Sequence, residues 1–429
     1  MNITIIGAGY VGLVSGVCFA HLGHKVLAVD RDKSKIKMLE QGVSPIYEPH
    51  LTERLQEHFR EGRIAFTTSI SEGVKHGEII FLAVDTPGKP SGEADLSAVE
   101  QVCQEIAKSI KDYRVIVEKS TVPVKTGEWV AKTINKYINP GVCFDVASNP
   151  EFLREGSAID DFLHPDRVVI GTTSDRAAAL LTKLYEPLNA PLLLCDINSA
   201  ELIKHCANAF LAMKISFINS VAQICELSGA DVKRVARGIG LDRRIGMEFL
   251  NAGVGYGGSC FPKDVAAFIK IAEQLNYDYG LLKEVSKINE EQKKLFVRKL
   301  EKALGSLSGK KAGILGLTFK PNTDDLRGAP ALDIIKILLK KGMKLKAYDP
   351  VGMEKTRQLI PELKTAKNPY DTAKNADALL ILTDWPEFYH LNLLEIKQLM
   401  HQPLIIDGRN IYEPGRMKEL GFKYYGMGR

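Results

Sequence analysis

A run of closely spaced glycines near the N-terminus constrains the fold of this chain more than any other feature. The segment Gly7–Gly12 has glycine at its first, third and sixth positions, and it directly follows the apolar run Ile3–Ile6. A helical pattern follows, Gly23 marks its end, and Lys25–Val29 has the composition of a second strand. A strand, a glycine turn, a helix and a strand in this order predict a βαβ unit whose helix N-terminus faces the turn.

An acidic residue, Asp30, ends the second strand eighteen positions after Gly12. In a dinucleotide-binding βαβ unit, the glycines let the backbone approach a pyrophosphate at the helix N-terminus, and the acid accepts a hydrogen bond from a ribose 2′-OH. A carboxylate at this place also repels the 2′-phosphate of NADP. The pattern therefore predicts NAD as cofactor, and the alternative is a purely structural turn followed by a solvated aspartate.

Apolar, β-rich runs alternate with helical stretches over the rest of residues 1–197. We expect buried parallel strands at four of these runs: Ile79–Val84, Val115–Glu118, Val142–Ser148 and Val168–Gly171. The alternation restarts after Gly309, and residues 374–386 repeat the pattern of residues 75–87. The fold class predicted is therefore α/β, with two doubly wound Rossmann-like domains at residues 1–197 and 305–429.

Residues 198–304 are predicted to form a helical connector between these domains. From Asn198 or Ser199, either of which suits an N-cap, the pattern is helical through Leu227, and Ser228 and Gly229 end it. At 1.5 Å per residue this helix is about 40 Å long, which is more than one domain needs. We expect it to join the two domains and to offer a surface for a homodimer.

Composition excludes several classes of protein. Lys and Arg number 57 against 52 Asp and Glu, a net charge of +5 without a long basic run, so no nucleic-acid partner is expected. Residues 1–23 carry no charged side chain except the N-terminus, but glycines interrupt them and no basic segment precedes them, so no membrane segment is expected. The seven cysteines show no C-x-x-C or metal-ligand spacing, which predicts a cytoplasmic protein without a metal site.

Cys260 differs in its surroundings from the other cysteines. Three glycines lie within the five residues before it, and Pro262, which suits the first position of a helix, follows it. A thiol at a helix N-terminus next to Lys263 is stabilised as a thiolate, so we predict a nucleophile, the alternative being an inert buried side chain. Together with NAD, a thiolate suits aldehyde oxidation, because a thiohemiacetal can be oxidised to a thioester that water hydrolyses to a carboxylate.

Three polar residues are further candidates for this chemistry. Lys204 and Asn208 stand four positions apart on the long helix and share a face, so they would stabilise an oxyanion if that face lines a cleft. The alternative for Lys204 is a solvated helix charge. Asp264, in the first turn after Cys260, would act as base for the attacking water, or it is an ordinary acid at a helix N-terminus.

The sequence resembles the UDP-glucose/GDP-mannose dehydrogenase family over essentially its whole length. The resemblance is carried by several long, order-specific motifs: Gly7–Gly12, Lys119–Pro123, Asn149–Gly156, Lys204 with Asn208, Phe249–Gly253, Gly257–Asp264, Leu317–Lys320 and Asp325–Arg327. It implies a four-electron oxidation of a nucleotide sugar at C6, from alcohol to acid, with two NAD+ used in turn. UDP-glucose is the implied substrate. GDP-mannose or another nucleotide sugar is the alternative, and a non-catalytic NAD- and nucleotide-sugar-binding regulator is the alternative from another class.

The resemblance also implies residue roles. The implied catalytic residues are Cys260, Lys204, Asn208, Asp264, Thr121 and Glu151. The implied NAD contacts are Gly7, Gly9, Tyr10, Val11, Gly12, Asp30, Lys35, Thr86, Thr121, Glu155, Lys263 and Arg327. The implied substrate contacts are Glu151, Phe152, Leu153, Arg154, Glu155, Lys204, Asn208, Phe249, Leu250, Asn251, Ala252, Gly253, Gly257 and Lys320, with Arg244 reaching the site of a neighbouring subunit. Asp85 departs from the family pattern, which more often has Pro or Gly there, and this acid is expected to alter NAD affinity.

Overall fold

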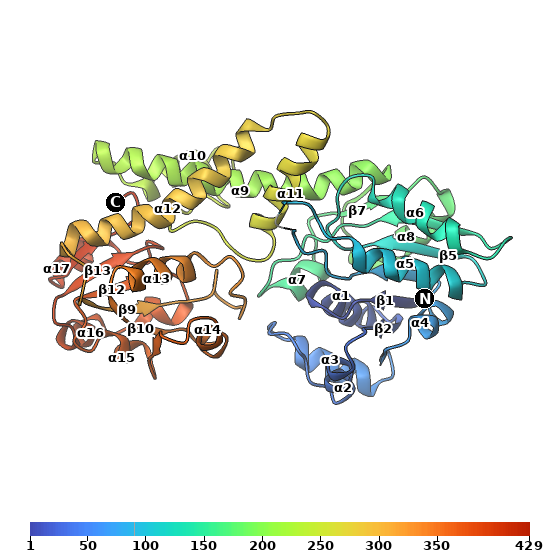
Figure 1. Cartoon of the computed structure of the whole chain (residues 1–429), viewed down its shortest axis with the longest axis horizontal. Helices are drawn as coiled ribbons and strands as arrows, with labels where there is room; N and C mark the ends of the chain where they lie inside the picture. Colours follow the sequence, from blue (N-terminus) through green and yellow to red (C-terminus); the bar gives the residue numbers. More distant parts are fainter. Residues whose placement is uncertain (90) are drawn as a thin grey trace. The chain divides into compact units, whose positions relative to one another are not determined.

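The computed structural model describes residues 1–89 and 91–429 and divides into two compact units (Figure 1). Unit 1 comprises Met1–Ala207 and Ala266–Leu275, and unit 2 comprises Asn208–Val265 and Asn276–Arg429. Two helices, α9 (Ile197–Ser228) and α11 (Phe261–Gln274), contribute residues to both units. The division into three domains at residues 197 and 304 stays a prediction.

Unit 1 is built on an eight-stranded sheet in the order β3-β2-β1-β4-β5-β6-β7-β8. The first six strands are mutually parallel, which confirms the predicted βαβ unit and three of the four further strands. The strands are β1 (Asn2–Ile6), β2 (Lys25–Val29), β3 (Ile64–Thr67), β4 (Ile79–Leu82), β5 (Arg114–Glu118), β6 (Phe144–Ser148), β7 (Val168–Gly171) and β8 (Leu192–Cys195).

The predicted direction of β7 is wrong. The strand lies where expected, but Ser148 at the end of β6 pairs antiparallel with Gly171 at the end of β7, and β7 pairs parallel only with β8. A parallel neighbour needs a connection that returns the chain to the start of the preceding strand. The segment after β6 instead leads past the carboxyl edge of the sheet, so β7 runs back toward that edge. An apolar run carries no information about this direction.

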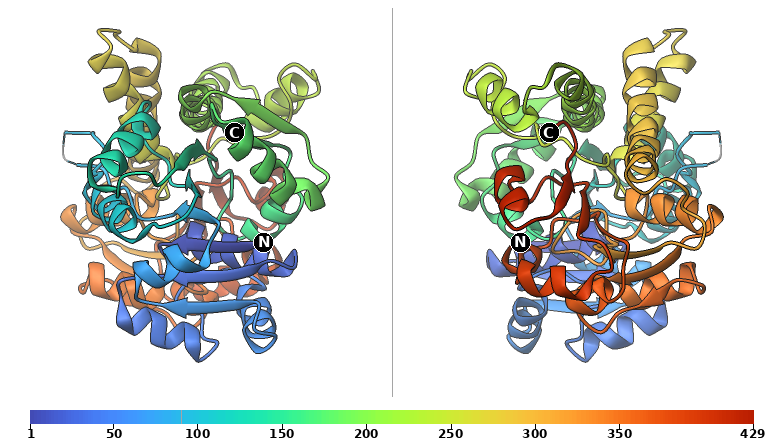
Figure 2. Two further views of the ribbon diagram at one scale, coloured as in Figure 1. Left: turned by 90° about the vertical axis from the view of Figure 1, so that its right-hand side faces the viewer. Right: turned by 90° about the vertical axis from the view of Figure 1, so that its left-hand side faces the viewer.

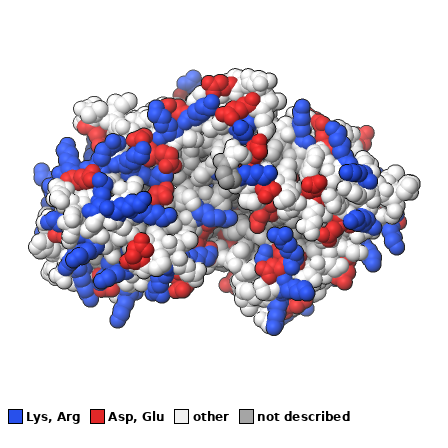
Figure 3. Space-filling model, viewed as in Figure 1, with Lys and Arg blue, Asp and Glu red and all other residues white. Residues whose placement is uncertain are grey.

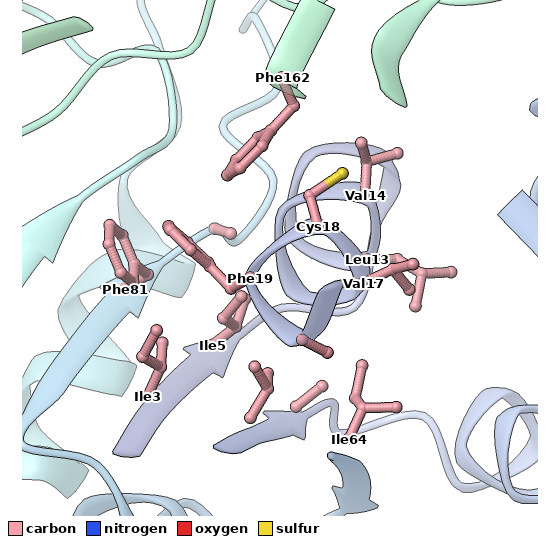
Figure 4. Close-up of a cluster of buried hydrophobic side chains, with 14 of the residues drawn as sticks. Ile3, Ile5, Leu13, Val14, Val17, Cys18, Phe19, Ile64, Phe81 and Phe162 are labelled. Carbon is pink, nitrogen blue, oxygen red and sulfur yellow. The ribbon is translucent and has the colours of Figure 1, made fainter. Parts of the chain in front are cut away.

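Helices cover both faces of the sheet of unit 1 (Figures 1 and 2). On one face, α1 (Tyr10–His21) packs with α3 (Leu51–Arg60), α7 (Ala158–Leu163) and α8 (Asp175–Tyr185). Figure 4 shows this core, in which the ring of Phe19 from α1 lies 5.2 Å from that of Phe81 and 5.0 Å from that of Phe162. On the other face lie α4 (Ile70–His76), α5 (Ser97–Ser109) and α6 (Thr126–Tyr137). The short α2 (Lys33–Glu40) follows Asp30.

Unit 2 contains the predicted second Rossmann-like sheet, whose order β11-β10-β9-β12-β13-β14 repeats that of the first six strands of unit 1. All its strands are parallel: β9 (Lys311–Leu315), β10 (Lys344–Tyr348), β11 (Lys364–Thr365), β12 (Ala378–Ile381), β13 (Leu404–Asp407) and β14 (Lys423–Tyr425). One face is covered by α12 (Gly280–Leu304) and α13 (Pro330–Lys340). The other is covered by α15 (Pro369–Ala373), α16 (Leu393–Leu399) and α17 (Pro414–Glu419), and α14 (Met353–Leu359) follows β10.

The long helix α9 has the predicted extent, and Gly229 ends it with a φ of 75°. Its predicted N-cap is wrong by two or three residues. Asp196 supplies the cap, because its Oδ1 accepts a hydrogen bond of 2.8 Å from the backbone N–H of Ser199. By length and composition alone α9 could cross a membrane, with 33% of its most apolar window buried. One such helix is weak evidence for a membrane protein.

Acidic and basic side chains are interspersed on the face of the molecule in Figure 3.

Candidate functional site

The glycine turn of unit 1 leaves space for a ligand at one of its three glycines. A Cβ on Gly7 would overlap the carbonyl of Ala83, and one on Gly12 would overlap the carbonyl of Gly7. At Gly9 the nearest atom to such a Cβ is Asp85 Oδ1, 3.8 Å away. Gly9 is the N-cap of α1, with no side chain capping it and no acid in the first turn. The open, positive helix end fits the pyrophosphate of a dinucleotide, and Asp85 stands beside it.

Asp30 lies where the predicted ribose contact requires it, at the carboxyl end of β2. Its Oδ2 accepts hydrogen bonds from the backbone N–H of Ala8, at 2.9 Å, and from Lys35 Nζ, at 2.7 Å. Its Oδ1 accepts from the N–H of Asp32 at 3.0 Å. Asp30 therefore holds the glycine turn and the predicted NAD contact Lys35 in one network.

Two hydroxyl groups form hydrogen bonds between the segment that follows β4 and the segment that follows β5. The buried Thr86 donates from Oγ1 to the carbonyl of Thr121 at 2.9 Å, and Ser120 donates from Oγ to the carbonyl of Val84 at 2.7 Å. In a doubly wound sheet, the carboxyl ends of the strands are where ligands bind. Thr86 and Thr121, both predicted NAD contacts, are thus adjacent at that edge.

Sequence reasoning missed Glu48, which is buried and caps α7. Its two carboxylate oxygens accept from the backbone N–H groups of Gly156, at 2.6 Å, and Ala158, at 2.7 Å. The Tyr10 hydroxyl also donates to it, and burial and this carboxylate raise the pKa of Tyr10 well above its usual range. Glu48 therefore ties α1 to the residues that directly follow the predicted substrate segment 151–155. Its partners lie too far along the sequence for any local pattern to show this.

Glu151 and Lys204 form a buried ion pair in unit 1. Glu151 Oε1 lies 3.1 Å from Lys204 Nζ, and the two side chains are 7% and 5% exposed. The other carboxylate oxygen accepts from the backbone N–H of Leu153 at 2.6 Å. The ring of Phe152 lies below two cations, with Lys204 Nζ 5.4 Å and the Arg167 guanidinium carbon 3.6 Å from its centroid. Lys204 is thus not the solvated helix charge that the sequence left open.

A buried pair of carboxyl groups, Glu118 and Glu201, lies where α9 is anchored to the segment after β5. Glu201 accepts from the backbone N–H groups of Lys125, at 2.6 Å, and Gly127, at 2.8 Å, at the start of α6. Glu118, at the end of β5, faces it, and burial followed by the charge of Glu201 raises the pKa of Glu118 well above the usual value. Neither residue is among the predicted site residues.

Cys260 in unit 2 lies directly before α11, as predicted, and Pro262 takes the second position of that helix rather than the first. The Ser259 hydroxyl is 3.5 Å from Cys260 Sγ. The backbone is crowded here: a Cβ on Gly257 would overlap the carbonyl of Gly328, and Gly258 has a φ of 87° beside the ring of Phe319. The glycines before Cys260 are therefore required for this close approach of two backbone segments.

Asn208 and Asp264 are in direct contact within unit 2. Asn208 Nδ2 donates to Asp264 Oδ2 at 2.6 Å, and Lys263 Nζ lies 2.9 Å from Asp264 Oδ1. Asp264 is 1% exposed, so it is not an ordinary solvated acid at a helix N-terminus. This contact orients the Asn208 amide, and it places a neutral donor on Oδ2 of Asp264 while the Lys263 ammonium lies beside Oδ1.

Four side chains that sequence reasoning missed hold the loop before Cys260. Gly253 donates its N–H to Asn219 Oδ1 at 2.9 Å and accepts from Gln292 Nε2 at 2.9 Å. Asn289 bonds to both backbone polar groups of Tyr256, and Arg409 donates from Nη1 to the carbonyl of Gly255 at 3.5 Å. Amide side chains on helices and single arginines in loops are both common, so no signal in the sequence singles out these residues.

The remaining predicted contacts in unit 2 are placed as follows. Phe249 has a φ of 64°, a left-handed conformation that a phenylalanine rarely adopts, and its ring lies 6.1 Å from that of Phe261. Lys320 Nζ lies 5.5 Å from the ring of Phe319. Two arginines are exposed and paired with nearby acids: Arg327 with Asp325 and Arg244 with Asp242, their closest contacts being 2.7 Å and 2.6 Å.

The Rossmann-like sheet of unit 2 does not repeat the dinucleotide site of unit 1. Asp349 ends β10 as Asp30 ends β2, but it is completely buried. Its oxygens accept from the backbone N–H groups of Leu317, at 2.7 Å, and Gly352, at 2.7 Å, and from the indole of Trp385, at 3.1 Å. A carboxylate occupied in this way is closed to a ribose, so the dinucleotide geometry belongs to unit 1.

The structure thus gathers the predicted residues in two groups. Unit 1 contains the glycine turn, Asp30, Lys35, Thr86, Thr121, residues 151–155 and Lys204. Unit 2 contains Asn208, Arg244, residues 249–253, Gly257, Cys260, Lys263, Asp264, Lys320 and Arg327.

Comparison with known proteins gives one consistent result. Residues 1–189 match the NAD binding domain of the UDP-glucose/GDP-mannose dehydrogenase family, residues 198–291 its central domain and residues 313–414 its UDP binding domain. UDP-glucose 6-dehydrogenase TuaD from Bacillus subtilis is 48% identical over all of this chain and 93% of its own length. UDP-glucose 6-dehydrogenase from Rhizobium meliloti is 47% identical over the full length of both. The structure of a UDP-glucose dehydrogenase from Pyrobaculum islandicum matches with a TM-score of 0.94 and 39% identity, covering 100% of this chain and 98% of that one.

Proposed function

The chain belongs to the UDP-glucose/GDP-mannose dehydrogenase family and catalyses the NAD-dependent oxidation of UDP-glucose, and we propose that it proceeds through two oxidations at C6 to UDP-glucuronate with Cys260 as nucleophile. The observation that carries the proposal is the position of Cys260. It lies at the N-terminus of α11, after glycines that bring two backbone segments together. A helix N-terminus stabilises a thiolate, which is the form that attacks an aldehyde.

NAD+ supplies the hydride acceptor for each oxidation. The open position at Gly9, the uncapped start of α1 and the Asp30 carboxylate at the end of β2 fit its pyrophosphate and ribose. The other proposed NAD contacts on unit 1 are Lys35, Thr86, Thr121 and Glu155, and those on unit 2 are Lys263 and Arg327. Asp30 orients the ribose and excludes a 2′-phosphate.

Cys260 Sγ forms a bond to C6 of the aldehyde, and the carbonyl oxygen takes up the negative charge before it is protonated to the thiohemiacetal. The Lys204 ammonium and the Asn208 amide, one turn apart on α9, stabilise that oxygen. Loss of hydride from C6 and of the hydroxyl proton gives the thioester. Asp264, with Thr121 and Glu151, handles the proton of the attacking water, and cleavage of the C6–S bond returns the thiolate and releases the carboxylate.

The stoichiometry of NADH formation tests this function. We expect two NADH per UDP-glucose in an absorbance assay at 340 nm, with no free aldehyde captured by a carbonyl reagent. GDP-mannose serves as the competing substrate. One NADH per sugar with release of aldehyde, or faster turnover of GDP-mannose than of UDP-glucose, would contradict the proposal.

A homodimer through α9 is part of the proposal. Phe210, Phe217 and Ile224 follow one another at intervals of seven residues and are 58%, 53% and 63% exposed. Residues at this spacing share a helix face, and exposed apolar stripes of this kind are typical of protein interfaces. Phe217→Asp is expected to give a monomer in sedimentation velocity, and a dimer that survives this change would contradict the assignment. Arg244 is proposed to reach the site of the partner.

The proposed location is the cytoplasm. All seven cysteines lie within the described residues and are free thiols, four of them partly or fully exposed. Free thiols persist in a reducing compartment.

A further inference from the structure

The carboxylate of Glu48 joins two segments of unit 1 that are proposed to bind different ligands. One is the start of α1, which is proposed to hold the NAD pyrophosphate, and the other is segment 151–155, which is proposed to contact the sugar. The buried Glu48 carboxylate accepts from the Tyr10 hydroxyl at the start of α1. It also accepts from the backbone N–H groups of Gly156, at 2.6 Å, and Ala158, at 2.7 Å. One side chain therefore holds both segments.

The loop that carries Glu48 is itself anchored, so Glu48 does not depend on a ligand for its position. Ser44 Oγ donates to the carbonyl of Ile46 at 2.8 Å, and the Glu48 carbonyl accepts from the N–H of Leu51 at 3.3 Å. Leu51 begins α3 and is completely buried, and Ile46 packs against the same core. The core and α3 thus fix the place of the carboxylate.

Glu48 also takes the place of a local cap for α7. Ser157, the N-cap of this helix, forms no side-chain capping bond, so Glu48 satisfies the N–H groups at the helix start. The position of α7 is passed on to the proposed substrate segment through Asp161. Its Oδ2 accepts from the backbone N–H of Arg154 at 2.7 Å, and its Oδ1 pairs with the Arg154 guanidinium at 2.6 Å.

We propose that Glu48 is a positioning residue that holds the start of α1 and segment 151–155 in their binding positions before either ligand arrives. The inference rests on the proposed function, because that function assigns NAD and the sugar to these segments. Ordering a mobile segment weakens binding, so a segment that is already ordered binds its ligand more tightly. Without Glu48, NAD and UDP-glucose would each have to order their own segment.

The experiment measures the Kd of NAD+ alone and of UDP-glucose alone by isothermal titration calorimetry, in wild type and three variants. In Glu48→Gln the amide has one oxygen. Whichever way the amide turns, either the Gly156 N–H or the Ala158 N–H loses its acceptor. Tyr10→Phe removes the link to α1, whereas Gly156 keeps its bond to Glu48.

Asp145→Asn is the matched control. The Asp145 carboxylate also accepts from a tyrosine hydroxyl, that of Tyr113 at 2.5 Å, and from the hydroxyl of Ser174, the N-cap of α8, at 2.5 Å. It lies near the amino end of β6, whereas segment 151–155 follows the carboxyl end of that strand. The control therefore disturbs a similar network at the opposite edge of the sheet.

We expect Glu48→Gln to raise the Kd of both ligands roughly tenfold, which corresponds to the loss of one buried hydrogen bond. Tyr10→Phe should raise the Kd of NAD+ more than that of UDP-glucose. Asp145→Asn should bind both ligands as wild type does. A merely structural role of Glu48 would lower the Tm of Glu48→Gln and leave both Kd values at the wild-type level.

A folded Glu48→Gln protein that binds either ligand with the wild-type Kd would overturn the inference. If Glu48→Gln does not fold, Glu48→Asp takes its place, since its side chain is one methylene too short to reach all three donors at once, and the same result is expected. Failure of the proposed function is recognised separately, as one NADH per UDP-glucose in wild type. The Kd comparison needs neither Cys260 nor turnover, so it still decides the role of Glu48 in that case.

Discussion

Replacing Lys204 by Met should unfold unit 1 more easily and stop catalysis, and a second substitution should restore only the stability. The ion pair between Lys204 and Glu151 spans 3.1 Å between side chains that are 5% and 7% exposed. Breaking a buried pair by removing one partner costs about 3–5 kcal/mol, because the other charge stays buried without its partner. Here the Leu153 N–H still donates to Glu151, and Lys119 lines the same cavity as Glu151. We therefore expect Lys204→Met to lower the free energy of unfolding by the lower limit of this range, about 3 kcal/mol.

The double variant Lys204→Met/Glu151→Gln removes both charges. Replacing a whole buried pair by neutral groups is often neutral or stabilising, so its free energy of unfolding should return to within about 1 kcal/mol of wild type. At roughly 2–4 °C per kcal/mol for a domain of this size, Lys204→Met should lower Tm by about 6–12 °C, and the double variant should recover most of that loss. Differential scanning calorimetry without NAD measures the Tm values of both variants.

Activity should follow a different order. Both variants lack the donor for the oxyanion, so kcat should fall about 10²- to 10³-fold in each, with little change in NAD affinity. A double variant that is as unstable as the sum of the two single changes would refute the buried-pair argument. Near-normal kcat in Lys204→Met would refute its proposed part in the reaction.

Three further predictions concern other parts of the molecule. Cys260→Ala should form no UDP-glucuronate while keeping the wild-type Tm, because the residue lies in a loop before α11. Cys260→Ser should form UDP-glucuronate very slowly and accumulate an ester, which mass spectrometry would detect as added mass. Asp30→Ala should weaken NAD binding at least tenfold, because it removes a charged hydrogen bond of about 1.5 kcal/mol or more. It should also shift the ratio of kcat/KM for NAD to kcat/KM for NADP toward NADP. Asp32→Ala, which removes only the cap of α2, should leave this ratio unchanged. Glu118→Gln should become more stable relative to wild type as the pH rises above about 4.3, because the pKa of Glu118 is raised in the folded state. Wild type has the full stabilisation from this group only below the unfolded-state pKa, and it loses that stabilisation as the pH rises toward the folded-state pKa. Glu100→Gln, an exposed control, should show no such trend in urea unfolding.

Much of unit 1 could be predicted from the sequence because the decisive signals are local. The turn at Gly7–Gly12, the helix after it and the acid at Asp30 all lie within thirty residues, and each depends on its immediate neighbours. Cys260 could be placed before a helix for the same reason, since glycines and Pro262 act within one or two turns. The second Rossmann-like sheet followed from the recurrence of the same local pattern.

Tertiary structure decided everything that depends on a distant partner. Glu48 bonds to Gly156 across 108 positions, and Asn208 reaches Asp264 across 56. A side chain's chemistry states which bonds it can form, but packing decides which buried donor or acceptor is close enough to form them. The direction of β7 depends likewise on the path of its connection, not on its apolar residues. The sequence by itself therefore determined the two Rossmann-like folds, the cofactor class and the position of Cys260 directly before a helix. Only the fold decided that Glu151 and Lys204 form a buried ion pair and that backbone N–H groups occupy the carboxylate of Asp349, because the cost of burying a charge can be met only by groups that folding brings to it.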